Sequence, residues 1–350
     1  CIPKQLQKIT MQTILVTGAA GFIGANFIEY FLSTTKNIHV VNLDALTYAG
    51  DLSNLAHIKH HSNYTFEKGD IYDRRLIEKL FEKYRFKGVV HFAAESHVDN
   101  SISNPNAFVR TNINGTFNLI DVAKCFWMKG PNDYKDGFKN ARFHHISTDE
   151  VFGTLGEVGL FTETTPYAPN SPYSASKGAA DFLVRSYFYT YGMDVVTTNC
   201  SNNYGPKQHD EKLIPTIIRK AISGEAIPIY GDGKNSRDWV YVLDHCKGIQ
   251  LVYKKGKAGE TYNIGGKNER NNLYVAHKIC EILETGTAKA LIKLQQRIPE
   301  TVIEMLKLPN LGPKRVRVLY RDLKIKNLKQ LSLAARKGRI RALEGFGEKT

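Results

Sequence analysis

The sequence predicts an α/β protein built on a doubly wound parallel sheet, and three observations support this fold class. Short apolar segments alternate with amphipathic segments along most of the chain, which is the order expected of parallel strands joined by helices. A glycine-rich turn follows the first apolar segment, and an aspartate ends the second. Polar side chains follow the later apolar segments, at the sheet edge where such proteins bind ligands.

Composition and length limit the other classes of protein. The chain has 350 residues, enough for two domains. It shows no apolar run as long as a membrane span and no signal-peptide pattern, so we expect a cytoplasmic protein without membrane contact. Its five cysteines are scattered without a CxxC pair, which predicts reduced thiols and neither a metal site nor disulfides. Residues 1–10 show no pattern, and Met11 is the expected natural start.

The first predicted strand, Thr13–Val16, leads into the turn Thr17–Gly24 with GxxGxxG spacing. Glycines there allow a tight turn and close approach of a pyrophosphate to the start of a helix. The second strand, Ile38–Leu43, ends at Asp44, 26 residues after Gly18. A carboxylate at this place suits the ribose hydroxyls of NAD and would repel the extra phosphate of NADP. A helix cap or a turn is the alternative role for Asp44.

Two further strands and a helix follow. The third strand, Tyr64–Lys68, precedes Asp70, which we expect to accept a hydrogen bond from the adenine amine. The fourth, Val89–Ala94, is apolar apart from one histidine, and polar residues 95–99 leave its carboxyl end. A helix over 107–127 and a strand over 142–147 complete this part.

The stretch Ser147–Lys177 carries the predicted chemistry. Tyr173 and Lys177 are four residues apart, so on a helix they share one face. An ammonium beside a phenol lowers the pKa of the phenol, which predicts that Tyr173 acts as a general base. Asp149 and Glu150 add two carboxylates at the end of an apolar segment, more than a simple dehydrogenase needs.

The helix of Tyr173 is expected to stop at Gly192, and a strand follows over 195–199. The segment 200–206 is rich in turn residues and amides that suit sugar hydroxyls. Arg237 lies beside Trp239 in the sequence, and its planar fork of donors suits a phosphate; an ordinary surface arginine is the alternative.

Residues 11–284 resemble the extended short-chain dehydrogenases/reductases, and within them the dTDP-glucose 4,6-dehydratase family. The resemblance implies a Rossmann-type sheet and a smaller substrate domain. The Asp-Glu pair, SNNYGP and EKLIP are more specific than the glycine turn and YxxxK. The segments that carry the resemblance are TGAAGFIG (17–24), LDALTYAG (43–50), FAAESHVD (92–99), STDEVFG (147–153), YSASK (173–177), CSNNYGP (200–206), EKLIP (211–215), RDWVYV (237–242) and YNIGG (262–266).

This resemblance implies a role for each catalytic residue. Tyr173 takes the proton of the sugar 4-hydroxyl while carbon 4 gives a hydride to NAD. Lys177 holds the ribose, and Thr148 bonds the 4-oxygen. Glu150 removes the proton on carbon 5, and Asp149 protonates the leaving 6-hydroxyl. The hydride then returns to carbon 6, which converts dTDP-glucose to dTDP-4-keto-6-deoxyglucose.

The same resemblance implies which residues bind NAD and the substrate. Separately, a second copy of the chain is a candidate partner. The NAD-binding residues are Gly18, Gly21, Phe22, Ile23, Gly24, Asp44, Asp70, Ile71, Ala93, Tyr173 and Lys177. The substrate-binding residues are Glu95, Ser96, Asn202, Lys212, Leu213, Arg237 and Asn272.

The chain departs from the family at three places. Residues 207–210 read Lys-Gln-His-Asp where the family often has Tyr-Gln-Phe-Pro, and Leu243 replaces an acidic residue. The family also has an Arg-Pro-Gly-His-Asp-x-Arg-Tyr motif that helps to bind the nucleotide. This motif is absent from the chain. We therefore expect a truncated substrate domain over 201–284, after an NAD-binding domain over 11–200. The alternative activity is that of another NAD-dependent nucleotide-sugar epimerase/dehydratase. Related epimerases and decarboxylases generally lack the Asp-Glu pair.

The last segment, 285–350, is strongly basic. It holds 16 Lys and Arg against 5 Asp and Glu, which is most of the net charge of +14. Such asymmetry favours nucleic acid as a partner, and a solvated basic surface is the plain alternative. From about residue 281 the chain resembles the helix-hairpin-helix region of family X DNA polymerases, on LPNLGPKRV and GRIRALEGFGEKT. The resemblance implies DNA-phosphate contacts by Gly312, Lys314, Arg315, Gly345 and Gly347.

The two resemblances meet near residues 281–283, and both modules are cut there. We interpret this meeting point as an accidental, chimeric join. The alternative of a different class is a non-specific DNA-binding fragment with an impaired enzyme core.

Overall fold

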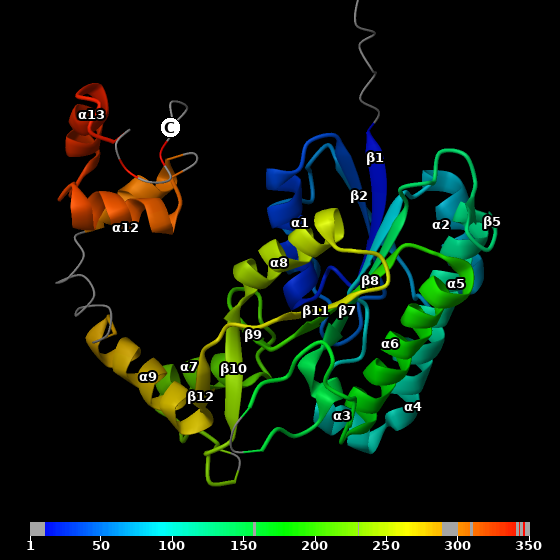
Figure 1. Cartoon of the computed structure of the whole chain (residues 1–350). Coiled ribbons are helices and arrows are strands. Elements are labelled where there is room, and N and C mark those ends of the chain that lie inside the picture. Colours follow the sequence, from blue (N-terminus) through cyan, green and yellow to red (C-terminus); the bar gives the residue numbers. More distant parts are fainter. Residues whose placement is uncertain are drawn as a thin grey trace, which may run out of the picture. The chain divides into compact units, whose positions relative to one another are not determined.

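The computed structural model describes residues 11–156, 159–229, 231–288, 300–308, 311–340, 343 and 346 (Figure 1). It divides into two compact units, which we describe separately. The first comprises residues 1–219 and 227–274, and the second comprises 220–226 and 275–350. The sequence predicted a division into four segments, namely 1–10, 11–200, 201–284 and 285–350, and this division stays a prediction.

A seven-stranded sheet forms the centre of the first unit, with the strand order β11-β8-β7-β4-β1-β2-β3. Every neighbouring pair is parallel, as predicted. Six of the strands match the apolar segments of the sequence, because segments buried on both faces must be apolar throughout. Their bounds are β1 Gln12–Thr17, β2 Ile38–Asp44, β3 Tyr64–Lys68, β4 Gly88–His91, β7 Arg142–Thr148, β8 Val195–Cys200 and β11 Thr261–Ile264.

Helices cover both faces of this sheet (Figure 1). On one face α1 (Phe22–Thr34) packs against α8 (Val242–Lys255), and their apolar side chains share a core with β1 and β2. On the other face lie α2 (Arg74–Tyr84), α5 (Thr116–Trp127) and α6 (Pro172–Tyr191), around the buried Trp127. Both faces are therefore closed to water, and only the ends of the strands are open to ligands.

The bounds of α6 follow from its sequence. Ser171 forms a capping box with Ser174, and Pro172 occupies the first helical position. Gly192 ends the helix in the left-handed conformation, with φ of 66°. These are standard start and stop signals, and the end predicted at Gly192 is confirmed.

The helix predicted over 107–127 is not continuous. It consists of α4 (Pro105–Phe108), a π-helical segment η2 (Val109–Gly115) and then α5. A π-helical turn holds an extra residue and is often found at functional sites. No feature of the apolar periodicity indicated it.

Short elements complete the first unit. Residues beyond 200, expected to form only the substrate domain, also supply β11 to the main sheet. A small sheet has the order β12-β10-β9, with β10 parallel to β9 and antiparallel to β12. The bounds of these short elements are η1 Leu52–Leu55, α3 Val98–Ser103, β5 Met128–Gly130, β6 Asp133–Tyr134, η3 Asp149–Phe152, β9 Asn202–Tyr204, β10 Ser236–Tyr241 and β12 Glu269–Asn271. Two helices, α7 Leu213–Ser223 and α9 Asn272–Thr285, have residues in both units.

The second unit has an apolar core of its own. Its helical elements are α11 (Glu300–Glu304), η4 (Met305–Lys307), α12 (Pro313–Asp322) and α13 (Leu328–Arg336). Met305 and Leu319 are fully buried in a cluster that also holds Val302, Leu331 and Phe346. Over the described ranges, no helix has the length and apolar character that crossing a membrane requires.

We predict that Leu319→Ala destabilises the second unit by about 2–5 kcal/mol, because truncation leaves a cavity in its core. Leu333→Ala is the matched control, since Leu333 lies on α13 and is 54% exposed; it should cost less than about 0.5 kcal/mol. Hydrogen exchange of the α12 amides measures both values. Equal protection in the two variants would mean that this cluster is not a core.

Candidate active site

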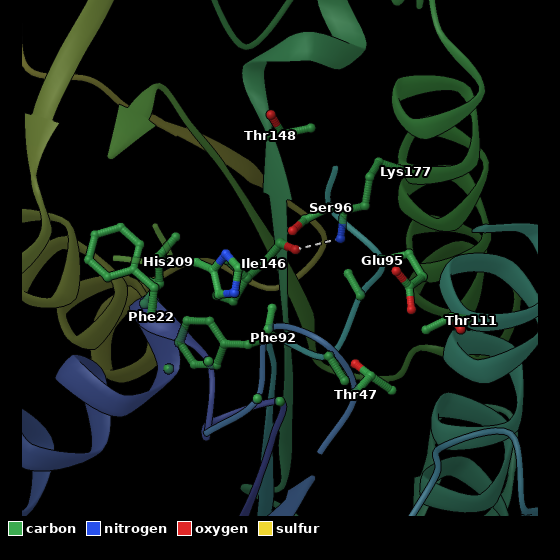
Figure 2. Close-up of a pocket in the computed structure, with 18 of the residues that line it drawn as sticks. Phe22, Thr47, Phe92, Glu95, Ser96, Thr111, Ile146, Thr148, Lys177 and His209 are labelled. Atoms are coloured by element: carbon green, nitrogen blue, oxygen red, sulfur yellow. Dashed lines mark hydrogen bonds between the residues drawn. The ribbon is translucent and has the colours of Figure 1, made fainter. Parts of the chain in front are cut away.

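One pocket lies at the carboxyl ends of the central strands (Figure 2). In Figure 2, Phe22, Phe92 and His209 lie toward one side of it, and Glu95 and Thr111 lie toward the other. Residues far apart in the sequence meet here because the strands are parallel and end at one edge. This is the place where open α/β sheets bind ligands.

The glycine-rich turn between β1 and α1 forms one wall. Gly18 has φ of +72°, and a Cβ on it would lie 2.5 Å from the backbone of Ala93. A Cβ on Gly24 would lie 2.6 Å from the Cα of Ala19. Gly21 precedes α1, whose first residues, Phe22 and Ile23, also line the pocket. A close approach of backbone therefore requires these glycines, and the N–H groups of the first helical turn suit an anion.

Asp44 fixes the conformation of this turn. One of its oxygens accepts a hydrogen bond from the Ala20 amide and the other from the Leu46 amide, both at 2.8 Å. Burial raises the pKa of Asp44, although these two bonds oppose the shift. Asp44 lines the pocket, so both of its expected roles, ligand contact and turn residue, fit its place.

The other expected NAD-binding residues also line the pocket, namely Asp70, Ile71 and Ala93. Asp70 is engaged by protein groups: Oδ2 accepts from Nη2 of Arg110 at 3.0 Å, and Oδ1 accepts from the Tyr72 amide at 2.9 Å. A hydrogen bond from adenine would therefore share an already occupied carboxylate.

The segment after β7 presents the predicted carboxylates. Thr148 ends the strand and caps η3, accepting a hydrogen bond from the Glu150 amide at 3.3 Å. Asp149 and Glu150 occupy the first turn of η3, and all three residues line the pocket. The short helix thus holds two acidic side chains beside the strand end.

The two carboxyl groups have different electrostatic surroundings. Burial, and next the charge of Glu150, raise the pKa of Asp149 to about 7. Burial also raises the pKa of Glu150, but the positive charges of Arg237 and Lys212 oppose that shift. Near neutral pH, Asp149 can therefore carry a proton while Glu150 is better stabilised as a carboxylate.

Tyr173 and Lys177 stand one turn apart on α6 and face the same pocket. The Nζ of Lys177 donates a hydrogen bond to the carbonyl oxygen of Ile146 at 2.8 Å (Figure 2). Tyr173 hydrogen-bonds with Thr148, so the phenol, the threonine and the strand end are in contact.

The prediction that Lys177 lowers the pKa of Tyr173 is wrong for this structure. Burial, and next the charge of Glu150, raise the pKa of Tyr173 well above its ordinary value, and only the hydrogen bond with Thr148 opposes them. The ammonium of Lys177 is directed to a backbone carbonyl instead.

The expected substrate residues separate into two groups. Glu95, Ser96, Asn202 and Lys212 line the pocket. Leu213, Arg237 and Asn272 are not among its lining residues, although Arg237 is close enough to lower the pKa of both Asp149 and Glu150.

Three residues were missed from the sequence: Cys200 and His209, which line the pocket, and Asn112, which holds the backbone of the pocket residue Glu95. Asn112, in the π-helical turn, donates to Oγ of Ser176 at 2.8 Å and exchanges two hydrogen bonds with the backbone of Glu95. The departure at residues 207–210 was the available signal for His209, whereas periodicity contains none for Asn112.

The expected DNA-phosphate residues belong to the second unit. Gly312 precedes α12 and Lys314 is exposed in its first turn. The Arg315 guanidinium lies over the Phe346 ring, 5.6 Å from its centroid. Gly345 and Gly347 lie outside the described residues. Within the described ranges, no three His, Cys, Asp or Glu side chains are grouped as a metal site would require.

Comparison with protein families decides the relationship of the chain. The model of a family described as GDP-mannose 4,6 dehydratase matches residues 15–306. The chain belongs to this family. The match covers the whole pocket and ends before α12.

Relatives narrow the similarity within the GDP-mannose 4,6-dehydratase family. A dTDP-glucose 4,6-dehydratase from Xanthomonas campestris is 55% identical over 274 residues, 78% of this chain and 77% of the relative. One from Escherichia coli is 50% identical over 77% and 76%. A crystal structure of the Bacillus anthracis enzyme in complex with NAD superposes with a TM-score of 0.70 at 44% identity, covering 80% and 83%. These comparisons support the activity of an NAD-dependent dTDP-glucose 4,6-dehydratase, a lyase.

We predict that Glu150→Gln lowers the pKa of Asp149 by about one unit, because the substitution removes the adjacent negative charge. The control is Glu82→Gln on the exposed side of α2, which should leave the pKa of Asp149 at about 7. Carbon-13 NMR of the labelled Asp149 carboxyl measures the titration. An unchanged midpoint in Glu150→Gln would show that the two carboxyl groups do not interact.

Proposed function

We propose that this chain converts dTDP-glucose to dTDP-4-keto-6-deoxyglucose with NAD as cofactor. The observation that carries the proposal is the meeting of Asp149 and Glu150 with Tyr173 and Lys177 in one pocket. Oxidation of an alcohol needs a base and a hydride acceptor, whereas elimination of water also needs a second base and an acid. The pocket contains residues suited to all of these proton transfers.

The residues present fit NAD. Side chains at Gly18 and Gly24 would meet the protein's own backbone within 2.6 Å, so these glycines keep the turn tightly folded where it lines the pocket. The start of α1 suits a pyrophosphate, and Asp44 suits the ribose. When bound, NAD would supply the hydride acceptor for carbon 4 and the hydride donor for carbon 6, and its positive nicotinamide ring would oppose the raised pKa of Tyr173.

Tyr173, Thr148 and Lys177 act together in the oxidation at carbon 4. The Tyr173 phenolate takes the proton of the 4-hydroxyl as carbon 4 is oxidised. Thr148, already hydrogen-bonded to the phenol, holds the 4-oxygen. Lys177 holds the ribose while its ammonium stays bonded to the Ile146 carbonyl. The resulting ketone acidifies the proton on carbon 5.

Glu150 and Asp149 act in the elimination of water, as base and acid. Glu150 takes the proton from carbon 5, since Arg237 and Lys212 favour its ionised form. Asp149, whose pKa is raised to about 7, donates its proton to the leaving 6-hydroxyl. The same two cations also suit the substrate diphosphate.

An epimerase is the alternative for this fold. A UDP-glucose 4-epimerase from Thermotoga maritima superposes with a TM-score of 0.69 at 28% identity. Epimerisation at carbon 4 needs no elimination, so it would leave Asp149 and Glu150 without a proton to transfer. The two carboxylates therefore favour dehydration.

We predict that the NAD-loaded protein forms a 4-keto-6-deoxy sugar nucleotide from dTDP-glucose. Tyr173→Phe should reduce kcat at least 100-fold by blocking oxidation. Glu150→Gln should reduce it similarly, yet still allow transient reduction of bound NAD, because it blocks only elimination. Product formation is followed by NMR and reduced NAD by absorbance at single turnover. A folded wild type that yields dTDP-galactose instead would support the epimerase.

The second unit favours a second candidate function, sequence-independent DNA binding. What supports it is that α11 with η4 and then α12 follow one another in the chain, joined by a short connection, and share an apolar core. The helix-hairpin-helix resemblance itself stays a prediction from the sequence. Leu311 donates to the Leu308 carbonyl at 3.2 Å, which closes part of the connection. Residues 309 and 310, its centre, lie outside the described residues. The amide groups at the start of α12 and the exposed Lys314 suit a phosphate.

We predict salt-sensitive binding of the full chain to a short DNA duplex of any sequence. Lys314→Gln should weaken it and reduce the slope of log affinity against log salt by about one. Lys329→Gln on α13 is the matched control, since it removes one exposed positive charge away from the hairpin. Fluorescence anisotropy measures both. Equal effects of the two variants would indicate a diffuse charge effect rather than a hairpin site.

A further inference from the structure

Asp181 is a buried carboxylate that the proposed reaction does not use. It lies on α6 one turn beyond Lys177, in the same stripe as Tyr173. Its side chain is only 4% exposed. A charged group so deeply buried is costly unless protein groups compensate it.

Three residues from outside α6 contact this carboxylate. Oδ2 accepts hydrogen bonds from Oγ of Ser147 at 2.8 Å and from the hydroxyl of Tyr167 at 2.9 Å. Oδ1 lies 3.1 Å from Nε2 of His145. His145 and Ser147 stand on either side of Ile146 on β7.

Ile146, which lies between His145 and Ser147, links these contacts to Lys177. Its carbonyl oxygen accepts the hydrogen bond of Lys177. Asp181 is therefore hydrogen-bonded to the residue that follows the group receiving the ammonium, and it lies beside the residue that precedes that group. The catalytic face of α6 is tied to β7 by Lys177 and, one turn later, by Asp181.

The charges around Lys177 come from several elements. His91 on β4 and His145 on β7 both have a pKa well below the usual range because they are buried, so they are neutral at pH 7. Burial raises the pKa of Cys200 on β8 to about 12, so it remains a thiol. Tyr167 likewise keeps its proton, since burial raises its pKa. Among these described groups, Asp181 is the one that can carry a negative charge and so stabilise the ammonium of Lys177.

The burial of both partners works against their charges. Burial lowers the pKa of Lys177, and the negative charge of Asp181 opposes that shift. The pKa of Asp181 is raised to about 6 by burial, with Lys177, Ser147 and Tyr167 opposing. At neutral pH the carboxylate is therefore mostly ionised, so each member of the pair stabilises the charge of the other.

We propose that Asp181 is a positioning residue, which keeps Lys177 protonated and holds it against the end of β7. The inference rests on the proposed function, because it concerns the group proposed to hold the ribose. Asp181 touches neither substrate nor cofactor and acts only through Lys177.

The test compares Asp181→Asn with the wild type. The amide keeps the size of the side chain and removes its charge, so the titration midpoint of Lys177 should fall by about one pH unit or more. Carbon-13 NMR of labelled lysine, with the signal assigned by Lys177→Met, measures this without cofactor. In the NAD-loaded enzyme, the alkaline limb of the kcat profile should shift to lower pH by the same amount.

Asp121→Asn is the matched control. Asp121 on α5 is also a largely buried carboxylate and accepts from a tyrosine, Tyr187, at 3.3 Å, but its cations are Arg74 and Lys124. It should leave the Lys177 midpoint unchanged. If Asp181→Asn does not fold, Ser147→Ala combined with Tyr167→Phe serves instead. Loss of those donors raises the pKa of Asp181, which removes its charge at pH 7.

A Lys177 midpoint unchanged in a folded variant, with an unshifted alkaline limb, would overturn the inference. If Asp181→Asn lowers the Lys177 midpoint but the wild type forms no keto sugar, the proposed function is overturned and the charge pairing of Asp181 with Lys177 stands. The two failures are therefore distinguishable.

Discussion

The hydrogen bond from Lys177 to the Ile146 carbonyl is the contact on which the site depends. It joins α6, which carries Tyr173, to β7, whose end carries Thr148 and the two carboxylates. These residues are some thirty positions apart in the chain, and only this docking of helix on strand brings them together.

The chemistry follows from an asymmetry between two adjacent carboxyl groups. Both are removed from water, but at Glu150 two cations, Arg237 and Lys212, oppose the effect of burial. At Asp149 the negative charge of Glu150 adds to the effect of burial, and Arg237 is the cation that opposes it. One site can thus hold a proton donor and a proton acceptor at the same pH. The pair explains why a fold shared with epimerases would catalyse elimination.

Sequence patterns predicted most of the fold and the residues of the pocket. Apolar runs identified six strands of the sheet, and Gly192 identified the end of α6. The π-helical turn that places Asn112 was not predictable, since one inserted residue leaves the apolar spacing nearly unchanged. The pKa of Tyr173 was predicted in the wrong direction, because spacing shows which charges share a helix face but not how deeply a phenol is buried.

The most direct test of the account follows the hydrogen on carbon 4. The protein would be incubated with dTDP-glucose deuterated at carbon 4 in ordinary water, and the product examined by NMR and mass spectrometry. The account predicts that deuterium appears at carbon 6 of a 4-keto-6-deoxy product, with a solvent proton at carbon 5. Deuterium retained at carbon 4 of an epimerised sugar would contradict it.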